Sequence, residues 1–214
     1  MITNEASARA WLREGLGCDD VTIARLESFV LELTQENARQ NLVSSGSLEN
    51  VWVRHIADSA QLLNVSRGTG GVWLDLGTGA GFPGLVTALL EPRREFVLVE
   101  SRSLRAQWLR KCVAALACEN ITVIESRLER VSTFAASTIS ARAFAPLSTL
   151  LGLAGRFSTP DSEWLLPKGK NAARELAEMP QAYRSMFHVE PSLTAGGAAI
   201  LVGRGVPSAA ARGS

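Results

Sequence analysis

Apolar residues recur at steps of three and four in the first third of the chain, a pattern typical of helices with one buried face. The pattern predicts three helices, over residues 5–14, 21–37 and 48–63. On the second helix the apolar face consists of Ile23, Leu26, Val30 and Leu33. Asn4 and Asp20 stand at the expected starts of the first two helices, and both residue types cap helix N-termini well. The chain is therefore expected to begin with a helical cap.

After the turn-rich segment 66–71 the pattern changes to short apolar runs that alternate with helical segments. The runs cover residues 72–77, 96–101, 121–126, 138–143, 164–169 and 198–203. Strands of this kind, joined by helices, predict a mostly parallel sheet that is covered on both faces, the doubly wound α/β class. We expect a helical cap over residues 1–65, an α/β core over 66–204 and a disordered tail over 205–214.

Composition and charge narrow the function classes. With 214 residues and 46% hydrophobic residues, the chain can bury a core of its own and is not a wholly disordered protein. The 22 basic and 21 acidic residues give a net charge of +1, so any nucleic-acid binding must come from a local patch. The three cysteines (Cys18, Cys112 and Cys118) form no CxxC pair, and we expect neither a disulfide framework nor a metal site. The N-terminus has no signal-like apolar run and no stretch is long enough for a membrane span, so a soluble, cytoplasmic protein is expected.

The most informative segment follows the first predicted strand, where Gly77, Gly79 and Gly81 give a GxGxG spacing. Glycines there let the backbone turn tightly and approach a ligand at the carboxyl ends of the strands. Asp75, two residues earlier, would repel a pyrophosphate but attract an ammonium group, which favours S-adenosylmethionine (SAM) over a dinucleotide. Glu100 ends the second predicted strand, where a carboxylate can accept hydrogen bonds from ribose hydroxyls. A dinucleotide site and a purely structural turn remain the alternatives.

Seven ordered motifs resemble the small-subunit (16S) ribosomal RNA guanine-N7 methyltransferases, historically the glucose-inhibited division protein B family. The motifs lie at residues 41–44 (NLVS), 54–59 (RHIADS), 75–84 (DLGTGAGFPG), 100–101 (ES), 126–129 (SRLE), 142–143 (RA) and 168–169 (KG). Two positions depart from the family pattern. Glu36 precedes Asn37 where the family has Trp-Asn, and Leu104 stands where the family has a basic residue. The departures concern the contacts of the cap and the basic helix, not the cofactor site.

The resemblance implies a class I SAM-dependent fold and assigns site residues. Gly77 and Phe82 would line the SAM pocket, Leu128 and Glu129 would flank the adenine, and Arg142 would lie by the methionine end or the guanine. Together with the residues singled out above, the expected cofactor set is Asp75, Gly77, Gly79, Phe82, Glu100, Leu128, Glu129 and Arg142. Simpler interpretations stay open: helix packing for Phe82, a solvated helix-cap acid for Glu129 and a surface ion pair for Arg142.

The resemblance also implies contacts with the RNA substrate. The expected residues are Arg54, His55, Arg105, Arg142 and Lys168, with His55 more often structural than catalytic in such a position. An ion pair between Arg54 and Asp58, four residues apart on a helix, is the simplest local explanation for the charged residues of the RHIADS motif. With the family match, we expect Arg54, His55 and Asp58 to hold the cap against the mouth of the active site.

The implied reaction needs no general base, because N7 of guanine carries a lone pair and no proton. The expected function is therefore catalysis by alignment. The expected partner is 16S ribosomal RNA within the small ribosomal subunit or an assembly intermediate, and the expected state is a monomer. Three alternatives remain: a small-molecule methyltransferase, an NAD-binding oxidoreductase with a Rossmann fold, and an RNA-binding module without activity.

Overall fold

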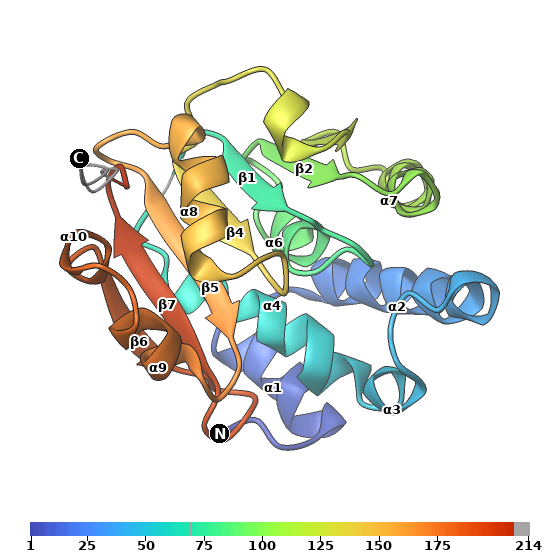
Figure 1. The fold of residues 1–214 in the computed structure, drawn as a ribbon. Coiled ribbons are helices and arrows are strands. Elements are labelled where there is room, and N and C mark those ends of the chain that lie inside the picture. The colour runs from blue at the N-terminus through green and yellow to red at the C-terminus, as the bar shows by residue number, and fades with distance from the viewer. Residues whose placement is uncertain (69, 208–214) are drawn as a thin grey trace.

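A computed structural model describes residues 1–68 and 70–207 and contains a seven-stranded sheet in the order β3-β2-β1-β4-β5-β7-β6 (Figure 1). The strands are β1 (Trp73–Leu76), β2 (Phe96–Glu100), β3 (Ile121–Glu125), β4 (Thr138–Ala141), β5 (Glu163–Lys168), β6 (Phe187–Pro191) and β7 (Ala199–Arg204). Strands β1 to β5 pair in parallel, whereas β7 is antiparallel to both of its neighbours. The predicted class, a doubly wound and mostly parallel sheet, is confirmed.

All six predicted strands are present, with ends that shift by one or two residues. The sequence pattern missed β6, whose central residues are exposed or half-buried because the strand lies at the edge of the sheet. An edge strand buries little surface, so it carries no continuous apolar run. Its last residue, Pro191, fits this position because proline cannot donate a ladder hydrogen bond.

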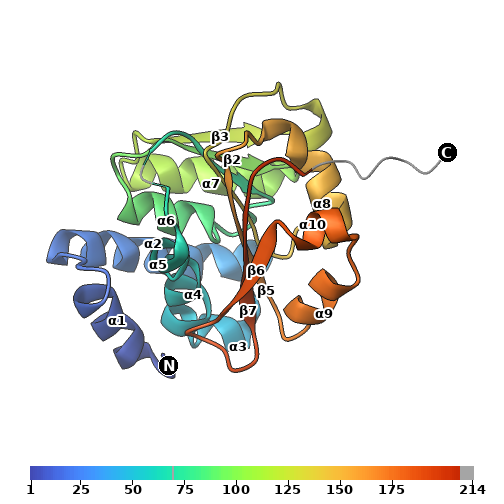
Figure 2. The same ribbon diagram turned by 90° about the vertical axis from the view of Figure 1, so that its left-hand side faces the viewer.

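Helices cover both faces of the sheet (Figure 2). On one side lie α1 (Glu5–Glu14), α2 (Asp20–Gln40), α6 (Gly84–Leu90) and α7 (Ser103–Ala115). On the other side lie α8 (Leu147–Ala154), α9 (Ala172–Ala177) and α10 (Gln181–Arg184). Two short 3₁₀ turns, η2 (Leu128–Arg130) and η3 (Gly155–Phe157), complete the second layer. Successive strand residues face opposite layers, so Trp73 belongs to one hydrophobic core and Leu74 to the other.

The first two helices follow the sequence closely. Asn4 caps α1, and its side chain accepts a hydrogen bond from the N–H of Ser7 at 2.8 Å. The cap of α2 is Asp19, one residue before the predicted Asp20, because the Asp19 carboxylate accepts the N–H of Thr22 at 2.8 Å. Helix α2 ends at Gln40, and its C-cap, Asn41, adopts a left-handed conformation with φ of 44°.

The third predicted helix is broken into shorter pieces. Residues of this region form α3 (Ser45–Leu48), the π-helical turn η1 (Trp52–Ala57), α4 (Asp58–Ala60) and α5 (Leu62–Val65). A π-helical turn widens the backbone, and such turns occur often at functional sites. The RHIADS motif spans the junction of η1 and α4.

The N-terminal helices share a hydrophobic core with the sheet. Leu12, Phe29 and Ile56 belong to the same buried cluster as Trp73 and Leu98 of the central strands. A boundary between cap and core at residue 65 stays a prediction. Most of the expected tail, residues 208–214, lies outside the described residues. Gly205, also placed in that tail, instead donates its N–H to the carbonyl of Ser162 at 2.8 Å. Within the described part of the chain, no helix has the length and apolar character needed to cross a membrane.

Candidate functional site

The candidate site lies where the strand order reverses. Strand β1 has β2 on one side and β4 on the other, so the loops that leave these strands diverge and open a crevice at their carboxyl ends. The loop after β1 contains Gly77, Gly79 and Gly81, with φ values of 65°, 60° and 115°. L-residues rarely adopt such angles, which explains why glycine occupies all three positions.

A cavity of about 360 Å³ opens beside this loop. Its wall includes Gly77, Glu100, Arg105, Leu128, Glu129 and Phe144. Four of the predicted cofactor residues therefore line one cavity: Gly77 from the loop after β1, Glu100 from the end of β2, and Leu128 and Glu129 from η2. Arg105 joins them, although the family resemblance implied a contact with RNA for it. A Cβ added to Gly77 would lie 2.7 Å from Cδ2 of Phe144, so only a glycine leaves room for the ring at this wall.

The carboxylate of Glu100 holds the loop to the end of β2. Its Oε2 accepts the N–H of Gly79 at 3.0 Å, and its Oε1 accepts the N–H of Arg102 at 2.8 Å. Glu100 is buried, yet each of its oxygens has a second lone pair to offer to a ligand hydroxyl in the cavity. Gly79 lies behind this contact and is absent from the cavity wall.

Asp75 is absent from the wall of this cavity, and its place beside a ligand ammonium, directly or through water, stays a prediction. Its side chain is fully buried, with Oδ1 accepting the hydroxyl of Ser140 at 2.5 Å and Oδ2 accepting the N–H of Gly84 at 3.1 Å. Burial raises the pKa of Asp75 to about 6, against the opposing effect of these hydrogen bonds. The carboxylate therefore joins β1, β4 and the start of α6.

Phe82 is also absent from the wall of this cavity, and its contact with SAM stays a prediction. The ring is 3% exposed and packs edge-on against Phe29, with 5.5 Å between ring centroids. The imidazole of His55 stacks on it, with centroids 4.5 Å apart and planes 14° apart. Arg142 covers the ring as well, with its guanidinium carbon 5.1 Å from the centroid. Phe82 thus packs against the side chains of His55 and Arg142, and it contacts the site through these two residues.

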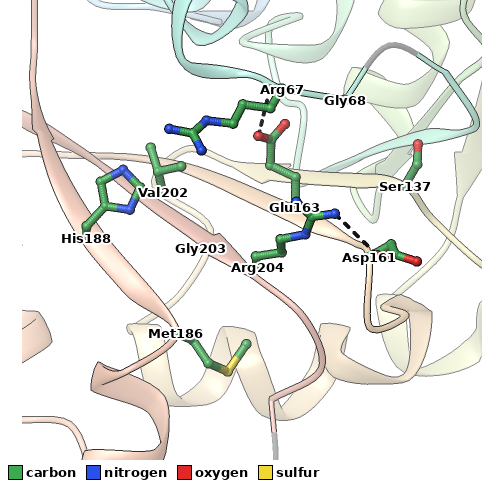
Figure 3. Close-up of a pocket in the computed structure, with 10 residues that line it drawn as sticks. All are labelled: Arg67, Gly68, Ser137, Asp161, Glu163, Met186, His188, Val202, Gly203 and Arg204. Atoms are coloured by element: carbon green, nitrogen blue, oxygen red, sulfur yellow. Dashed lines mark hydrogen bonds and ion pairs between the residues drawn. The ribbon is translucent and has the colours of Figure 1, made fainter.

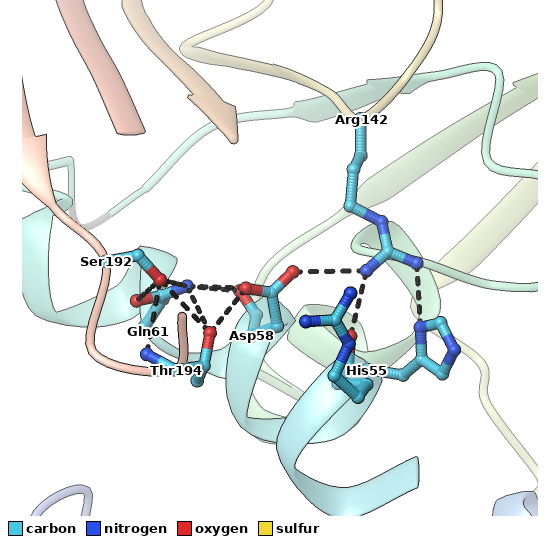
Figure 4. A network of polar contacts seen from close by, with 7 residues as sticks. His55, Asp58, Gln61, Arg142, Ser192 and Thr194 are labelled. Carbon is cyan, nitrogen blue, oxygen red and sulfur yellow. Dashed lines mark hydrogen bonds and ion pairs between the residues drawn. The ribbon is translucent and has the colours of Figure 1, made fainter. Parts of the chain in front are cut away.

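Arg142, directly after β4, is held between Asp58 and His55, two of the polar residues of the RHIADS motif (Figure 4). Its Nη1 lies 3.1 Å from Oδ2 of Asp58, and its Nη2 lies 3.1 Å from Nδ1 of His55. The predicted ion pair between Arg54 and Asp58 is not observed, because Asp58 pairs with Arg142 instead. The contacts of Arg142 with His55, Asp58 and the carbonyl of Arg54 join the N-terminal helices to the sheet, and their role at the mouth of the active site stays a prediction.

The protonation state of His55 follows from these contacts. Burial, with help from the charges of Arg142 and Arg54, lowers the pKa of His55 to about 3, so the ring is neutral at ordinary pH. A guanidinium can only donate, so Nδ1 of His55 accepts and the proton resides on Nε2. Among the described residues, this buried Nε2–H has no hydrogen-bond partner. It is a donor left available beside Arg142.

A second cavity of about 530 Å³ adjoins the same residues. Arg54, His55, Arg142 and Lys168 line it, which brings together four of the five residues predicted to bind the substrate. Lys168 is oriented by Glu175, whose carboxylate lies 3.0 Å from Nζ. Ala143, with a left-handed φ of 53°, belongs to the walls of both cavities. Both cavities therefore border the residue that follows Arg142.

Sequence reasoning missed a third contribution to this cavity, from the turn between β6 and β7. Thr194 donates its hydroxyl to Oδ1 of Asp58 at 2.7 Å. Gln61 accepts the N–H of Leu193 at 2.8 Å and donates to Asp58 at 2.9 Å, and Ser192 also lies against this group (Figure 4). The turn sequence PSLTAGG carries no motif, so no local signal marked it.

A further cavity, of about 190 Å³, lies at the opposite ends of the strands (Figure 3). Glu163, the first residue of β5, accepts the N–H of Arg67 there at 2.8 Å, and Arg204 pairs with Asp161 at 3.3 Å. Cations and carboxylates are mixed in this wall. It holds none of the residues predicted for a site.

Comparison with solved structures supports the fold. The precorrin-6y C5,15-methyltransferase of Geobacter metallireducens GS-15 superposes with a TM-score of 0.53 and 12% identity, over 78% of this chain and 91% of that chain. A mutant of MtNAS, solved in complex with S-adenosylmethionine, superposes with a TM-score of 0.54 and 16% identity, over 94% of this chain and 84% of that chain. At such identities the likeness concerns the fold alone, that of class I SAM-dependent methyltransferases.

Sequence comparison identifies the family. Proteins named ribosomal RNA small subunit methyltransferase G are 55% identical in Novosphingobium aromaticivorans, over 95% of this chain and 89% of that protein, and 55% identical in Erythrobacter litoralis, over 96% and 98%. The family described as GidB, rRNA small subunit methyltransferase G, matches residues 22–199. This chain belongs to the rRNA small subunit methyltransferase G family.

Proposed function

We propose that this protein transfers the methyl group of SAM to N7 of a guanine in 16S ribosomal RNA. The observation that carries the proposal is the junction at Ala143, the residue next to Arg142 that lines both cavities. One cavity has the size and the residues for the methyl donor and the other for the acceptor base. Such a junction is what a direct transfer between two bound molecules requires.

On the donor side, the chain offers a cradle that suits a nucleoside. Glu100 would accept hydrogen bonds from the ribose hydroxyls, and Leu128 and Glu129 would flank the adenine. Gly77 leaves its part of the wall open beside Phe144. When bound there, SAM supplies an electrophilic methyl group on a positively charged sulfur.

On the acceptor side, Arg54, Arg142 and Lys168 give the second cavity a basic lining. A flipped guanine with its phosphates would place the base within the cavity and its backbone against these cations. The cavity of about 530 Å³ holds a nucleotide comfortably. Arg105 would contact the donor, because it lines the donor cavity.

The residues at the junction are suited to alignment rather than proton transfer. N7 of guanine loses no proton when it is methylated, so no base is needed. His55 has a pKa of about 3 and is a poor base in this setting. Arg142 is fixed by Asp58 and His55, and it can hold a base or the donor's carboxylate in one orientation. Alignment of two reactants of this kind supplies about 7–11 kcal/mol of the barrier reduction.

We further propose that the substrate is an assembled or partly assembled small subunit, that the protein acts as a monomer and that it works in the cytoplasm. A net charge of +1 is small for an enzyme that holds naked RNA, so shape and a few local cations would carry the recognition. We also propose that residues 1–65 form a helical cap that is distinct from the α/β core.

The test is to map N7-methylguanine in ribosomal RNA from cells with and without the protein, then to repeat the transfer with purified components. Labelled methyl groups from SAM should enter small subunits that lack the mark, and enter refolded naked RNA much more slowly. Equal labelling of naked RNA would refute the assembled substrate, and the mark persisting in cells without the protein would refute the function. Labelling of metabolites instead of RNA would favour a small-molecule methyltransferase, and a thermal shift with NAD but not SAM would favour an oxidoreductase.

A further inference from the structure

Arg142 lines the second cavity and precedes Ala143, which borders both cavities, and its orientation depends on a partner far along the chain. Asp58 holds Nη1 of Arg142 at 3.1 Å through Oδ2. The other oxygen of Asp58 accepts the hydroxyl of Thr194 at 2.7 Å. Thr194 lies on the turn between β6 and β7 and is buried, with 8% of its surface exposed.

The turn itself is fixed on both sides, so the hydroxyl of Thr194 has a defined direction. The N–H of Thr194 donates to Oγ of Ser192 at 3.2 Å, and the N–H of Leu193 donates to Oε1 of Gln61 at 2.8 Å. Gln61 is 1% exposed and belongs to the segment that follows Asp58. The turn is therefore docked against α4 and Gln61, at the C-terminal side of the RHIADS motif (Figure 4).

We propose that Thr194 is a positioning residue for methyl transfer, acting through Asp58 on Arg142 and, through Arg142, on His55. The hydroxyl fixes the Asp58 carboxylate, the carboxylate fixes one end of the guanidinium, and the other end keeps Nδ1 of His55 as an acceptor. The proton of His55 then stays on Nε2, beside the cavity that takes the base. This inference rests on the proposed function and adds a residue that lies outside all seven sequence motifs.

The test compares Thr194→Val, which keeps the shape and removes the hydroxyl, with Thr194→Ser, which keeps the hydroxyl. For Thr194→Val we expect kcat with small subunits to fall about tenfold, the effect of one hydrogen bond to a charged group. KM for SAM and for the subunits should stay within about twofold, because the residue would align the reactants rather than bind them. Thr194→Ser should retain the wild-type kcat. Thr34→Val, the same substitution on the exposed face of α2, is the matched control.

A second measurement does not depend on activity. The chain has two histidines, so ¹⁵N spectra of the imidazoles can be assigned with a His188→Gln variant. The wild type and Thr194→Ser should show His55 as a single tautomer protonated at Nε2, and Thr194→Val should show a shift towards mixed tautomers at an unchanged fraction of folded protein.

The inference would be overturned by an unchanged kcat in Thr194→Val, by an equal loss of kcat in Thr194→Ser, or by an unchanged tautomer of His55 in Thr194→Val. A fall in kcat that matches a fall in the folded fraction would also overturn it, since the role would then be structural. If the wild type failed to methylate small subunits, the proposed function would fail, while the spectra would still decide whether Thr194 controls His55.

Discussion

The backbone N–H of Gly79 donates a hydrogen bond to Oε2 of Glu100 at 3.0 Å, which ties the loop after β1 to the end of β2. One carboxylate thus shapes the glycine loop and faces the proposed donor cavity. Glu100→Ala should weaken SAM binding by roughly 1–3 kcal/mol, because the loop loses its anchor and the ribose loses an acceptor. Titration calorimetry measures the change. Glu125→Ala is the matched control, because Glu125 pairs with Glu100 in the strand register but lies outside the cavity wall. An equal loss of SAM affinity in both variants would contradict the assignment of Glu100 to the donor cavity.

The contact between Gly77 and Phe144 gives a second prediction. Gly77→Ala combines a φ of 65°, which costs about 1–2 kcal/mol for an L-residue, with a Cβ placed 2.7 Å from the Phe144 ring. We expect Tm to fall by roughly 2–8 °C and SAM binding to weaken, measured by thermal melting with and without SAM. Gly46→Ala, where a Cβ meets nothing within 4 Å, should leave both unchanged or raise Tm slightly.

The buried imidazole of His55 predicts a pH dependence of stability. Its pKa is about 3 in the folded protein and near 6.5 when it is not buried, so between these values the unfolded chain binds more protons. The free energy of unfolding therefore falls as pH decreases below about 6.5, by about 2 kcal/mol at pH 5 from this residue alone. The variant His55→Gln keeps an acceptor for Arg142 and cannot titrate. Between pH 7 and pH 5 its free energy of unfolding should therefore fall by about 2 kcal/mol less than that of the wild type.

Urea unfolding at the two pH values measures this difference. His188→Gln removes the exposed histidine of β6 and should keep the wild-type pH dependence. The same dependence in His55→Gln as in the wild type would show that His55 is not the buried neutral group described above.

The carboxylate of Asp75 predicts a fourth result. It accepts one hydrogen bond from Ser140 and one from Gly84, so in Asp75→Asn the amide nitrogen must face one of these donors. A buried donor without an acceptor costs about 1–3 kcal/mol, and chemical denaturation should show a loss of that size. Asp161→Asn, at an exposed ion pair near the start of β5, should change stability by less than about 0.5 kcal/mol. A comparable loss of stability in both variants would show that the hydrogen bonds of the buried Asp75 carboxylate have no particular importance for stability.

Much of the fold followed from local patterns. The period of the helices and the continuous apolar runs of the strands predicted the central sheet because these elements bury their surfaces in a regular way. Strand β6 was not predicted because a strand at the edge of the sheet needs no continuous apolar run. The break of the third predicted helix at Trp52–Ala57 was not predicted, because a π-helical turn has the same composition as an ordinary helix.

The site was predictable only as far as its motifs are local. Spacing and resemblance identified Gly77, Glu100 and Leu128, which do lie together in one cavity. The directions of Asp75 and Phe82 depend on which neighbours the fold brings to them, and both side chains point into the packed interior. Thr194 carries no motif at all. It reaches Asp58 from 136 residues away in the sequence, a contact that only the folded chain reveals.

The late position of the β6–β7 turn has a bearing on how the protein matures. All the residues that line the proposed donor cavity have been made once the chain reaches Leu153, whereas the proposed acceptor cavity takes part of its wall from residues up to Ile200. During synthesis, a growing chain therefore lacks one wall of its acceptor cavity until the last strands emerge. We expect a newly made molecule to gain the ability to act on RNA only at the end of translation, after all the residues of the proposed donor cavity have been made.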